Sequence, residues 1–233
     1  MKTDAWHIDA CYSATQKCLS SPPGLSPVTF SDRAMDRVRE RRNPVQSWYL
    51  DMGLLFDYWG QERAYHHTAP ISANYAIREA LRLIREEGLE ARFARHRLNQ
   101  RALVAGLKAM GLELLVEESF RLWSLTTVKV PDQVCESAVR ARLLTEYGIE
   151  IGGGFGPLKG LVWRVGLMGE SSTMNNVILF LAVLENVLRL EGMKIEQGAG
   201  TRAAGDLYST SNLGAECLDV ASHGIFSPRP SKG

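Results

Sequence analysis

The sequence predicts an α/β protein that ends in a smaller α+β domain. Two observations lead to this prediction. Apolar residues recur at helical spacing through 71–87 and 89–110, and short runs rich in valine, threonine and isoleucine alternate with helical segments between 112 and 188. With 233 residues, of which 45% are hydrophobic and 23% charged, the chain is long enough for one or two domains with a large core.

Composition and charge argue against several classes of function. The formal net charge is +1, so no broad electric field draws the chain to nucleic acid or to an anionic membrane. No apolar run reaches the roughly 18 residues of a membrane span, and the N-terminus has no apolar signal core. Four scattered cysteines without paired spacing indicate free thiols in a reducing compartment, which favours the cytoplasm. The C-terminal Ser231-Lys232-Gly233 differs from the peroxisomal Ser-Lys-Leu signal.

The first distinctive stretch runs from Tyr12 to Gly24. Apolar runs at 8–12 and 25–30 flank a small polar segment that ends in a rigid Pro-Pro-Gly turn. This pattern predicts a strand, a loop and a second strand, with Lys17 on the loop. Because lysine is mostly exposed, an ordinary solvated charge is the alternative interpretation of Lys17.

The next two segments, 32–42 and 48–59, differ in how clearly their sequences predict a helix. Ser31 is expected to cap a short helix over 32–42, with an acidic residue early and arginines late, as the helix dipole favours. The aromatic-rich stretch 48–59 has a weaker helical signal because of Gly53. Since aromatic side chains mostly supply buried area, we expect this stretch to form core or a subunit interface.

Two adjacent histidines, His66 and His67, suggest a metal site at first sight. Neighbouring residues on an extended segment point to opposite faces, and no third ligand lies at a recognisable spacing. The sequence therefore predicts no metal site here.

Two long helices are predicted next, over 71–87 and 89–110, with Gly88 and Gly111 as stop signals. The second carries four arginines that could suggest nucleic-acid binding: Arg92, Arg95, Arg97 and Arg101. Interspersed glutamates and the near-zero net charge favour a solvated helix face instead.

The remainder predicts strands at 112–116, 123–130, 149–151 and 161–168. Helices are expected over 134–147 and from a cap at Ser171 or Ser172 through 188.

The glycine run from Gly152 indicates a tight turn or a close backbone approach, because the features of a phosphate loop are missing. Arg164 lies within an apolar strand, so it is either on the polar face or in need of a partner. Residues 196–233, rich in Gly, Ala and Ser, are expected to be a disordered tail.

Four segments in this order resemble the class V pyridoxal-phosphate (PLP) aminotransferases, in particular the alanine–glyoxylate and serine–pyruvate branch. They are Ser13-x-Thr15-Gln16-Lys17 followed by Pro22-Pro23-Gly24, then Tyr65-His66-His67-Thr68-x-Pro70, the Gly-Gly-x-Gly-Pro loop ending at Pro157, and Arg164-x-Gly166. The resemblance implies the C-terminal part of an aspartate-aminotransferase-like large domain, followed by a small α+β domain.

The resemblance also implies a set of roles. Lys17 would form the Schiff base with the PLP aldehyde, and Gln16 would contact the cofactor phosphate. Tyr65 and Thr68 would reach across a homodimer interface to the other subunit's cofactor phosphate, to which hydroxyls can donate. Arg164 would bind the substrate carboxylate through two parallel hydrogen bonds. The implied reaction is transamination of alanine or serine with glyoxylate or pyruvate.

This interpretation divides the chain into a remnant of the large domain (1–88), a connector helix with the small domain (89–195), and the tail (196–233). The family places further parts of the large domain before this segment, so we expect an N-terminally shortened member. Some relatives are peroxisomal or mitochondrial. Two alternatives remain: another PLP reaction, such as that of a lyase, on the same fold, or a catalytically incomplete protein that at most dimerises through 48–59.

Overall fold

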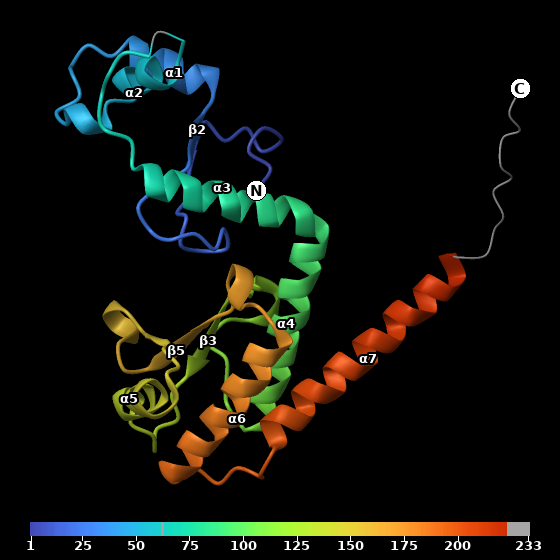
Figure 1. The fold of residues 1–233 in the computed structure, drawn as a ribbon. Coiled ribbons are helices and arrows are strands. Elements are labelled where there is room, and N and C mark those ends of the chain that lie inside the picture. The colour runs from blue at the N-terminus through green and yellow to red at the C-terminus, as the bar shows by residue number, and fades with distance from the viewer. Residues whose placement is uncertain (62, 223–233) are drawn as a thin grey trace, which may run out of the picture. The chain divides into compact units, whose positions relative to one another are not determined.

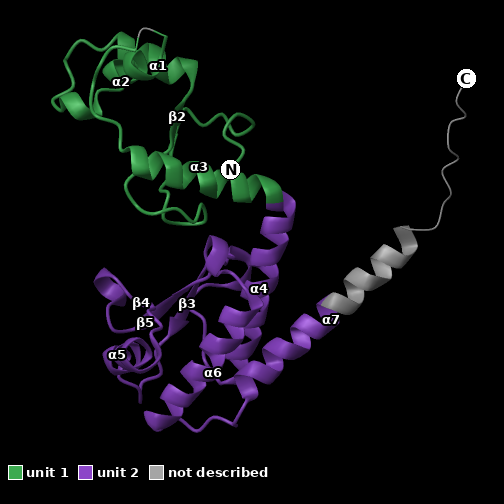
Figure 2. Ribbon diagram, in the orientation of Figure 1, with its two compact units in different colours: residues 1–86 green, residues 87–233 purple. Residues whose placement is uncertain are grey.

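The computed structural model describes residues 1–61 and 63–222, with side chains as far as Ser211 (Figure 1). Two compact units divide the chain, Met1–Glu86 and Glu87–Gly233 (Figure 2). This division falls two residues before the expected boundary at residue 88. The unit from Met1 to Glu86 is called unit 1 below, and the other unit 2.

Unit 1 begins with the predicted strand, loop and strand. Strand β1 (Ala10–Tyr12) pairs antiparallel with β2 (Val28–Phe30). Helix α1 (Asp32–Arg39) follows, and the Ser31 hydroxyl accepts the N–H of Ala34, so Ser31 is the predicted cap. The helix ends three residues before the expected end at 42.

A short 3-10 turn (Trp48–Leu50) precedes α2 (Met52–Trp59), and the Asp51 side chain caps this helix by accepting the N–H of Gly53. Gly53 thus lies in the first turn of the helix rather than interrupting it. Helix α3 (Ile71–Glu87) has the predicted bounds.

Unit 2 contains the main core and a small sheet. Its helices are α4 (Leu89–Ala109), α5 (Glu136–Tyr147), α6 (Met174–Leu190) and α7 (Ala199–Ser222). Its strands are β3 (Leu125–Lys129), β4 (Gly152–Gly153) and β5 (Val162–Gly166). They form an antiparallel sheet in the order β3-β5-β4, so β5 is central. Short 3-10 turns lie at Glu118–Phe120, Gly156–Leu158 and Gly169–Ser171.

The core of unit 2 forms where α4 packs against α6 and α7 and where α5 packs against α6 (Figure 1). Its largest fully buried side chain is Trp163 of β5, whose indole N–H donates to the Glu136 carbonyl oxygen at 3.3 Å. Leucines and valines at helical spacing on α4 and α6 supply much of the remainder, as predicted: Leu103, Leu107, Val177, Leu181, Leu184 and Leu188.

Three local predictions are corrected by the structure. Residues 112–116 do not form the expected strand, because this segment has a single isolated antiparallel β-bridge, between Leu114 and Val128. The short strand expected at 149–151 lies at Gly152–Gly153 instead. The cap of α6 is Thr173, whose hydroxyl accepts the N–H of Asn176, because Ser171 and Ser172 lie at the preceding 3-10 turn.

The prediction of a disordered tail over 196–233 is wrong for Ala199–Ser222, which forms α7. The Glu185 carboxylate of α6 accepts the N–H of Gly198 at 2.6 Å and of Gly200 at 3.4 Å, which satisfies N–H groups at the start of the helix. Ala204 and Tyr208 are buried. Residues 223–233 lie outside the described part of the chain.

None of the described helices is long and apolar enough to cross a membrane.

Candidate active site

Lys17 lies on a loop that is closed by backbone hydrogen bonds. The N–H of Ser20 donates to the Lys17 carbonyl oxygen at 2.9 Å, and the N–H of Ser21 donates to the Thr15 carbonyl oxygen at 3.0 Å. Gln16 and Lys17 are both exposed. The loop therefore fixes the backbone at Lys17 and leaves its amine accessible from solvent.

Thr15 joins this loop to the Pro-Pro-Gly turn. Its side chain is fully buried, and its hydroxyl donates to the Pro22 carbonyl oxygen at 2.7 Å, with the Leu25 carbonyl oxygen at 3.3 Å. An unpaired buried hydroxyl would cost about 1–3 kcal/mol, so this residue anchors the loop. The sequence motif contained Thr15, but its role as an anchor is visible only in the folded loop.

The hydroxyls of Tyr65 and Thr68 lie 3.1 Å apart, and both side chains are exposed. A spacing of three residues therefore brings two hydroxyl groups to one accessible position in unit 1. Hydroxyl groups donate well to anionic oxygens, so this pair can hold a phosphate.

His66 and His67 face each other, although the sequence predicted opposite faces. Their Nδ1 atoms are 2.8 Å apart, and Nε2 of His66 lies 3.1 Å from the Trp48 carbonyl oxygen. Because a carbonyl oxygen can only accept, neutral His66 carries its proton on Nε2 and accepts at Nδ1 from His67. The described residues contain no group of three or more His, Cys, Asp or Glu side chains arranged to hold a metal ion.

The aromatic stretch 48–59 is largely exposed, so its assignment to a core is wrong for this chain. Trp48, Tyr49 and Trp59 each expose more than half of their surface, and α2 contains no buried residue. The Trp48 ring stacks on His66 with centroids 4.0 Å apart. An exposed apolar surface of this kind is typical of a protein interface, which remains a prediction for this stretch.

Arg164 lies on the central strand β5, opposite Thr127 of β3 and Gly152 of β4. Its Nε donates to the Gly153 carbonyl oxygen at 2.7 Å, and its Cζ lies 4.0 Å from the centroid of the Phe155 ring. Among the described residues, no carboxylate forms an ion pair with Arg164. The guanidinium is thus oriented by its neighbours, and its terminal nitrogens can bind a carboxylate.

The glycine run makes room for this side chain. A Cβ on Gly152 would lie 3.0 Å from Nη2 of Arg164, and one on Gly154 would overlap the Leu158 carbonyl oxygen. Gly156 has a φ of 53°, which favours glycine. The sequence prediction of a close approach and a tight turn is confirmed, and the group that approaches Gly152 is Arg164.

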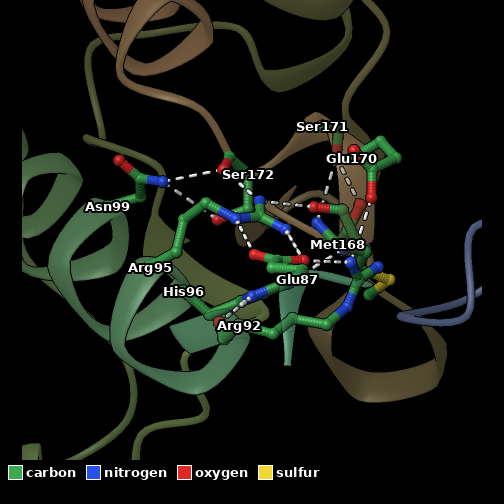
Figure 3. Close-up of polar contacts among 10 residues, drawn as sticks. Glu87, Arg92, Arg95, His96, Asn99, Met168, Glu170, Ser171 and Ser172 are labelled. Atoms are coloured by element: carbon green, nitrogen blue, oxygen red, sulfur yellow. Dashed lines mark hydrogen bonds and ion pairs between the residues drawn. The ribbon is translucent and has the colours of Figure 1, made fainter. Parts of the chain in front are cut away.

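A polar cluster on α4 holds the segment that follows β5 (Figure 3). Nη1 of Arg95 donates to the carbonyl oxygens of Gly169 and Ser172, at 2.9 and 2.6 Å. The Asn99 amide donates to the same Ser172 oxygen at 2.8 Å, and Nε2 of His96 accepts the N–H of Gly169 at 2.9 Å. These contacts fix the backbone a few residues after Arg164.

The same cluster corrects the interpretation of two arginines as part of a solvated face. Arg92 is buried, and its Nη1 binds Glu87 at 2.6 Å and Glu170 at 3.0 Å (Figure 3). Arg95 binds Glu87 through Nε at 2.5 Å and Nη2 at 3.0 Å. Hydrogen bonds from Arg95 and then from Arg92 lower the pKa of Glu87 to about 2. Sequence periodicity missed this cluster because its ion-pair partners lie outside the helix.

The family model "Aminotransferase class-V" matches residues 1–165. The chain belongs to the class-V aminotransferase family. This result confirms the resemblance stated from the four sequence segments, and members of this family are PLP enzymes.

Among relatives of this class-V aminotransferase chain is the (S)-ureidoglycine–glyoxylate transaminase of Bacillus subtilis. It is 42% identical over 229 residues, which cover 91% of this chain and 55% of the relative. The crystal structure of the B. subtilis ureidoglycine–glyoxylate aminotransferase superposes with a TM-score of 0.87 at 45% identity, covering 89% of this chain and 54% of that one.

An alanine–glyoxylate aminotransferase structure from a Nostoc species gives a TM-score of 0.79 at 53% identity, covering 80% and 50% of the two chains. The fold is therefore that of the aspartate-aminotransferase-like enzymes, as predicted. The chain spans about half the length of the curated relatives it matches.

The side chains of this class-V aminotransferase chain fit the cofactor of its family. Lys17 offers an accessible amine on a fixed loop, and the exposed Tyr65–Thr68 pair offers donors for a phosphate. Arg164, in unit 2, has terminal nitrogens available to a carboxylate. These groups suit the aldehyde and phosphate of PLP and the carboxylate of an amino acid.

Proposed function

We propose that this chain takes part in PLP-dependent transamination of a small amino acid with glyoxylate, using Lys17 as the residue that holds the cofactor. The observation that carries the proposal is the exposed amine of Lys17 on a loop closed at Thr15 and Ser21, within a chain of the class-V family. The names of the relatives support glyoxylate as the acceptor, because it occurs in each of those reported above.

PLP, when bound, supplies the electron sink that makes the Cα proton of an amino acid removable. The residues of this chain supply the groups that hold the cofactor, move the proton and bind the substrate. The Lys17 amine would hold the cofactor and, as a free neutral amine, would act as the general base that accepts the Cα proton of the donor amino acid and passes it to the cofactor. The donor amino acid would thereby lose its amino group and leave as a 2-oxo acid, and a second 2-oxo acid would receive that amino group and become an amino acid.

Arg164 binds the α-carboxylate of the substrate and fixes its orientation. Its contact with Gly153 and its position over Phe155 hold the guanidinium plane before substrate arrives. Such preorganisation reduces the ordering that binding requires. The same carboxylate is present in alanine, serine and ureidoglycine, so Arg164 selects for amino acids rather than for one donor.

Gln16 and the Tyr65–Thr68 pair are proposed to bind the cofactor phosphate. The two hydroxyls are exposed rather than turned into unit 1, which suits donation to a group on another subunit. The proposed assembly is a homodimer, with the exposed aromatic surface of 48–59 as part of its interface.

The test is the absorption spectrum of the purified chain after PLP addition and gel filtration. A retained visible band that disappears in Lys17→Ala and persists in the matched exposed-lysine variant Lys2→Ala supports the proposal. A folded chain, as judged by circular dichroism, that keeps no Lys17-dependent band contradicts it. Assays with glyoxylate and alanine, serine or ureidoglycine then identify the donor.

A further inference from the structure

A basic cavity lies on unit 2, and none of its residues takes part in the proposed reaction. It has a volume of about 600 Å³ and lies between one face of α4 and the segment before β3. This volume falls in the range of roughly 300–1,000 Å³ that is typical of small-molecule sites. The lining residues that matter here are Arg97, Gln100, Arg101, Lys108, Arg121 and Trp123.

The cavity concentrates positive charge on a nearly neutral chain. Arg97, Arg101 and Lys108 lie four and seven residues apart on α4, so they share one helix face, and Arg121 faces them. One carboxylate, that of Glu118, also lines the cavity and lies 3.5 Å from Arg121 and 3.9 Å from Lys108. The cavity is therefore lined by four cationic side chains and one carboxylate.

Arg97 and Arg101 form no ion pair with any carboxylate in the part of the chain that the structure describes. Like charges four residues apart on a helix repel each other and destabilise it by a few tenths of a kcal/mol. An anion bound between them would remove this repulsion.

Gln100 adds a neutral polar group to the lining of the cavity. Its exposed fraction is only 6%, yet it lines the cavity and its amide makes no hydrogen bond to another described residue. No buried side-chain nitrogen or oxygen of the described residues lacks a hydrogen-bond partner, so the amide atoms of Gln100 are themselves accessible, through the cavity that they line. The carboxamide is therefore an accessible donor and acceptor that a molecule bound in the cavity can contact.

Two further side chains are held in place before any ligand arrives. Nε of Arg121 donates to the Val116 carbonyl oxygen at 2.8 Å, and the side chain is only 15% exposed. Cζ of Arg97 lies 5.9 Å from the centroid of the Trp123 ring. An oriented guanidinium loses little freedom on binding an anion.

We propose that this cavity binds a small phosphate-bearing molecule. A phosphate group carries more than one negative charge at neutral pH and accepts forked hydrogen bonds from guanidinium groups, which matches the three arginines and the lysine. A single carboxylate would leave most of the cationic charge uncompensated. The site lies on α4 and is separate in sequence from Lys17, Tyr65, Thr68 and Arg164.

The test uses inorganic pyrophosphate as the probe with the full 233-residue chain. Isothermal titration calorimetry gives the affinity, and the indole N–H resonance of Trp123, assigned with Trp123→Phe, reports whether binding occurs in this cavity. We expect Arg101→Ala to weaken binding about tenfold, since it removes one charged hydrogen-bonding group. Gln100→Leu should weaken it severalfold.

Two matched variants control the experiment. Arg189→Ala removes an exposed arginine of α6 outside the cavity, and Lys194→Ala removes an exposed lysine outside the cavity. Both should bind pyrophosphate like the unaltered chain. The proposal is overturned if the Trp123 resonance does not shift saturably, or if Arg189→Ala weakens binding as much as Arg101→Ala does.

Discussion

Nε2 of His96 accepts the backbone N–H of Gly169 at 2.9 Å, while Nδ1 lies 2.7 Å from the Arg92 carbonyl oxygen. Because an N–H can only donate and a carbonyl oxygen can only accept, His96 is neutral with its proton on Nδ1. This side chain therefore joins α4 to the segment after β5 through one defined tautomer.

The tautomer of His96 can be checked directly. Two-bond ¹H–¹⁵N spectra should show the Nδ1-protonated form, and a spectrum of the Nε2-protonated form would contradict the geometry. His96→Phe should reduce the free energy of unfolding by about 1–3 kcal/mol, because it leaves the Gly169 N–H without its partner. Chemical denaturation measures the loss, and exposed Gln133→Ala, expected to be near neutral, is the control.

Glu87 should make the free energy of unfolding of the chain depend on pH in the acidic range. Its pKa in the folded chain is about 2 against an ordinary 4.5, because it accepts hydrogen bonds from Arg95 and Arg92. A lowered pKa contributes stability that is fully present above about pH 4.5 and is lost as the pH falls toward 2. We expect a loss of about 1–3 kcal/mol over this window, since the Glu87 side chain is three-quarters buried.

Urea denaturation at a series of pH values measures this effect. Glu87→Gln should be less stable at pH 7 and should show a flatter dependence between pH 4.5 and 2. Glu90→Gln, an exposed neighbour on α4, should keep the slope of the unaltered chain. Equal slopes for Glu87→Gln and the unaltered chain would show that the Glu87 cluster contributes nothing to acid sensitivity.

Gly152 should control substrate binding through Arg164. A Cβ at this position would lie 3.0 Å from Nη2, so Gly152→Ala should displace the guanidinium from its position over Phe155. In the proposed reaction, the KM for the amino donor should rise about tenfold with a smaller change in kcat, because a carboxylate contact is weakened. Gly205→Ala, where a Cβ meets nothing within 4 Å, should leave KM unchanged. An unaltered KM for Gly152→Ala would mean that this close approach does not position Arg164.

Glu185 should be required for α7. Replacement by alanine removes the acceptor for the N–H groups of Gly198, directly before the helix, and Gly200, in its first turn. We expect a loss of about 1–3 kcal/mol in the free energy of unfolding, with faster hydrogen exchange in 199–211 than elsewhere in unit 2. Glu150→Ala, at an exposed position of unit 2 outside α6 and α7, is the control. Unchanged protection of 199–211 in Glu185→Ala would show that α7 forms without this cap.

Local signals in the sequence predicted much of this chain correctly. The helix over 71–87, the cap at Ser31 and the strand pair around Lys17 depend on neighbouring residues, so periodicity and turn chemistry are sufficient to find them. The four family segments likewise pointed to the class-V family that the comparison shows.

The errors occurred where distant residues decide the structure. Sequence periodicity placed Arg92 on a solvated face, but Glu87 and Glu170 compensate its charge and allow it to be buried. The segment 112–116 has strand-like composition, yet only Leu114 finds a bridge partner on β3. His66 contacts both His67 and the carbonyl oxygen of Trp48, eighteen residues earlier, and the spacing of neighbouring residues predicts neither contact.

The sequence by itself determined the family and the identity of the proposed reactive groups, because these depend on residue types at short spacings. Only the tertiary structure decided that Thr15 anchors the Lys17 loop and that Gly152 accommodates Arg164. It also decided that residues 199–222 are helical, although their Gly, Ala and Ser content predicted disorder. The physical reason is that the Glu185 carboxylate on α6 satisfies the first N–H groups of α7, and α4 and α6 cover its apolar side.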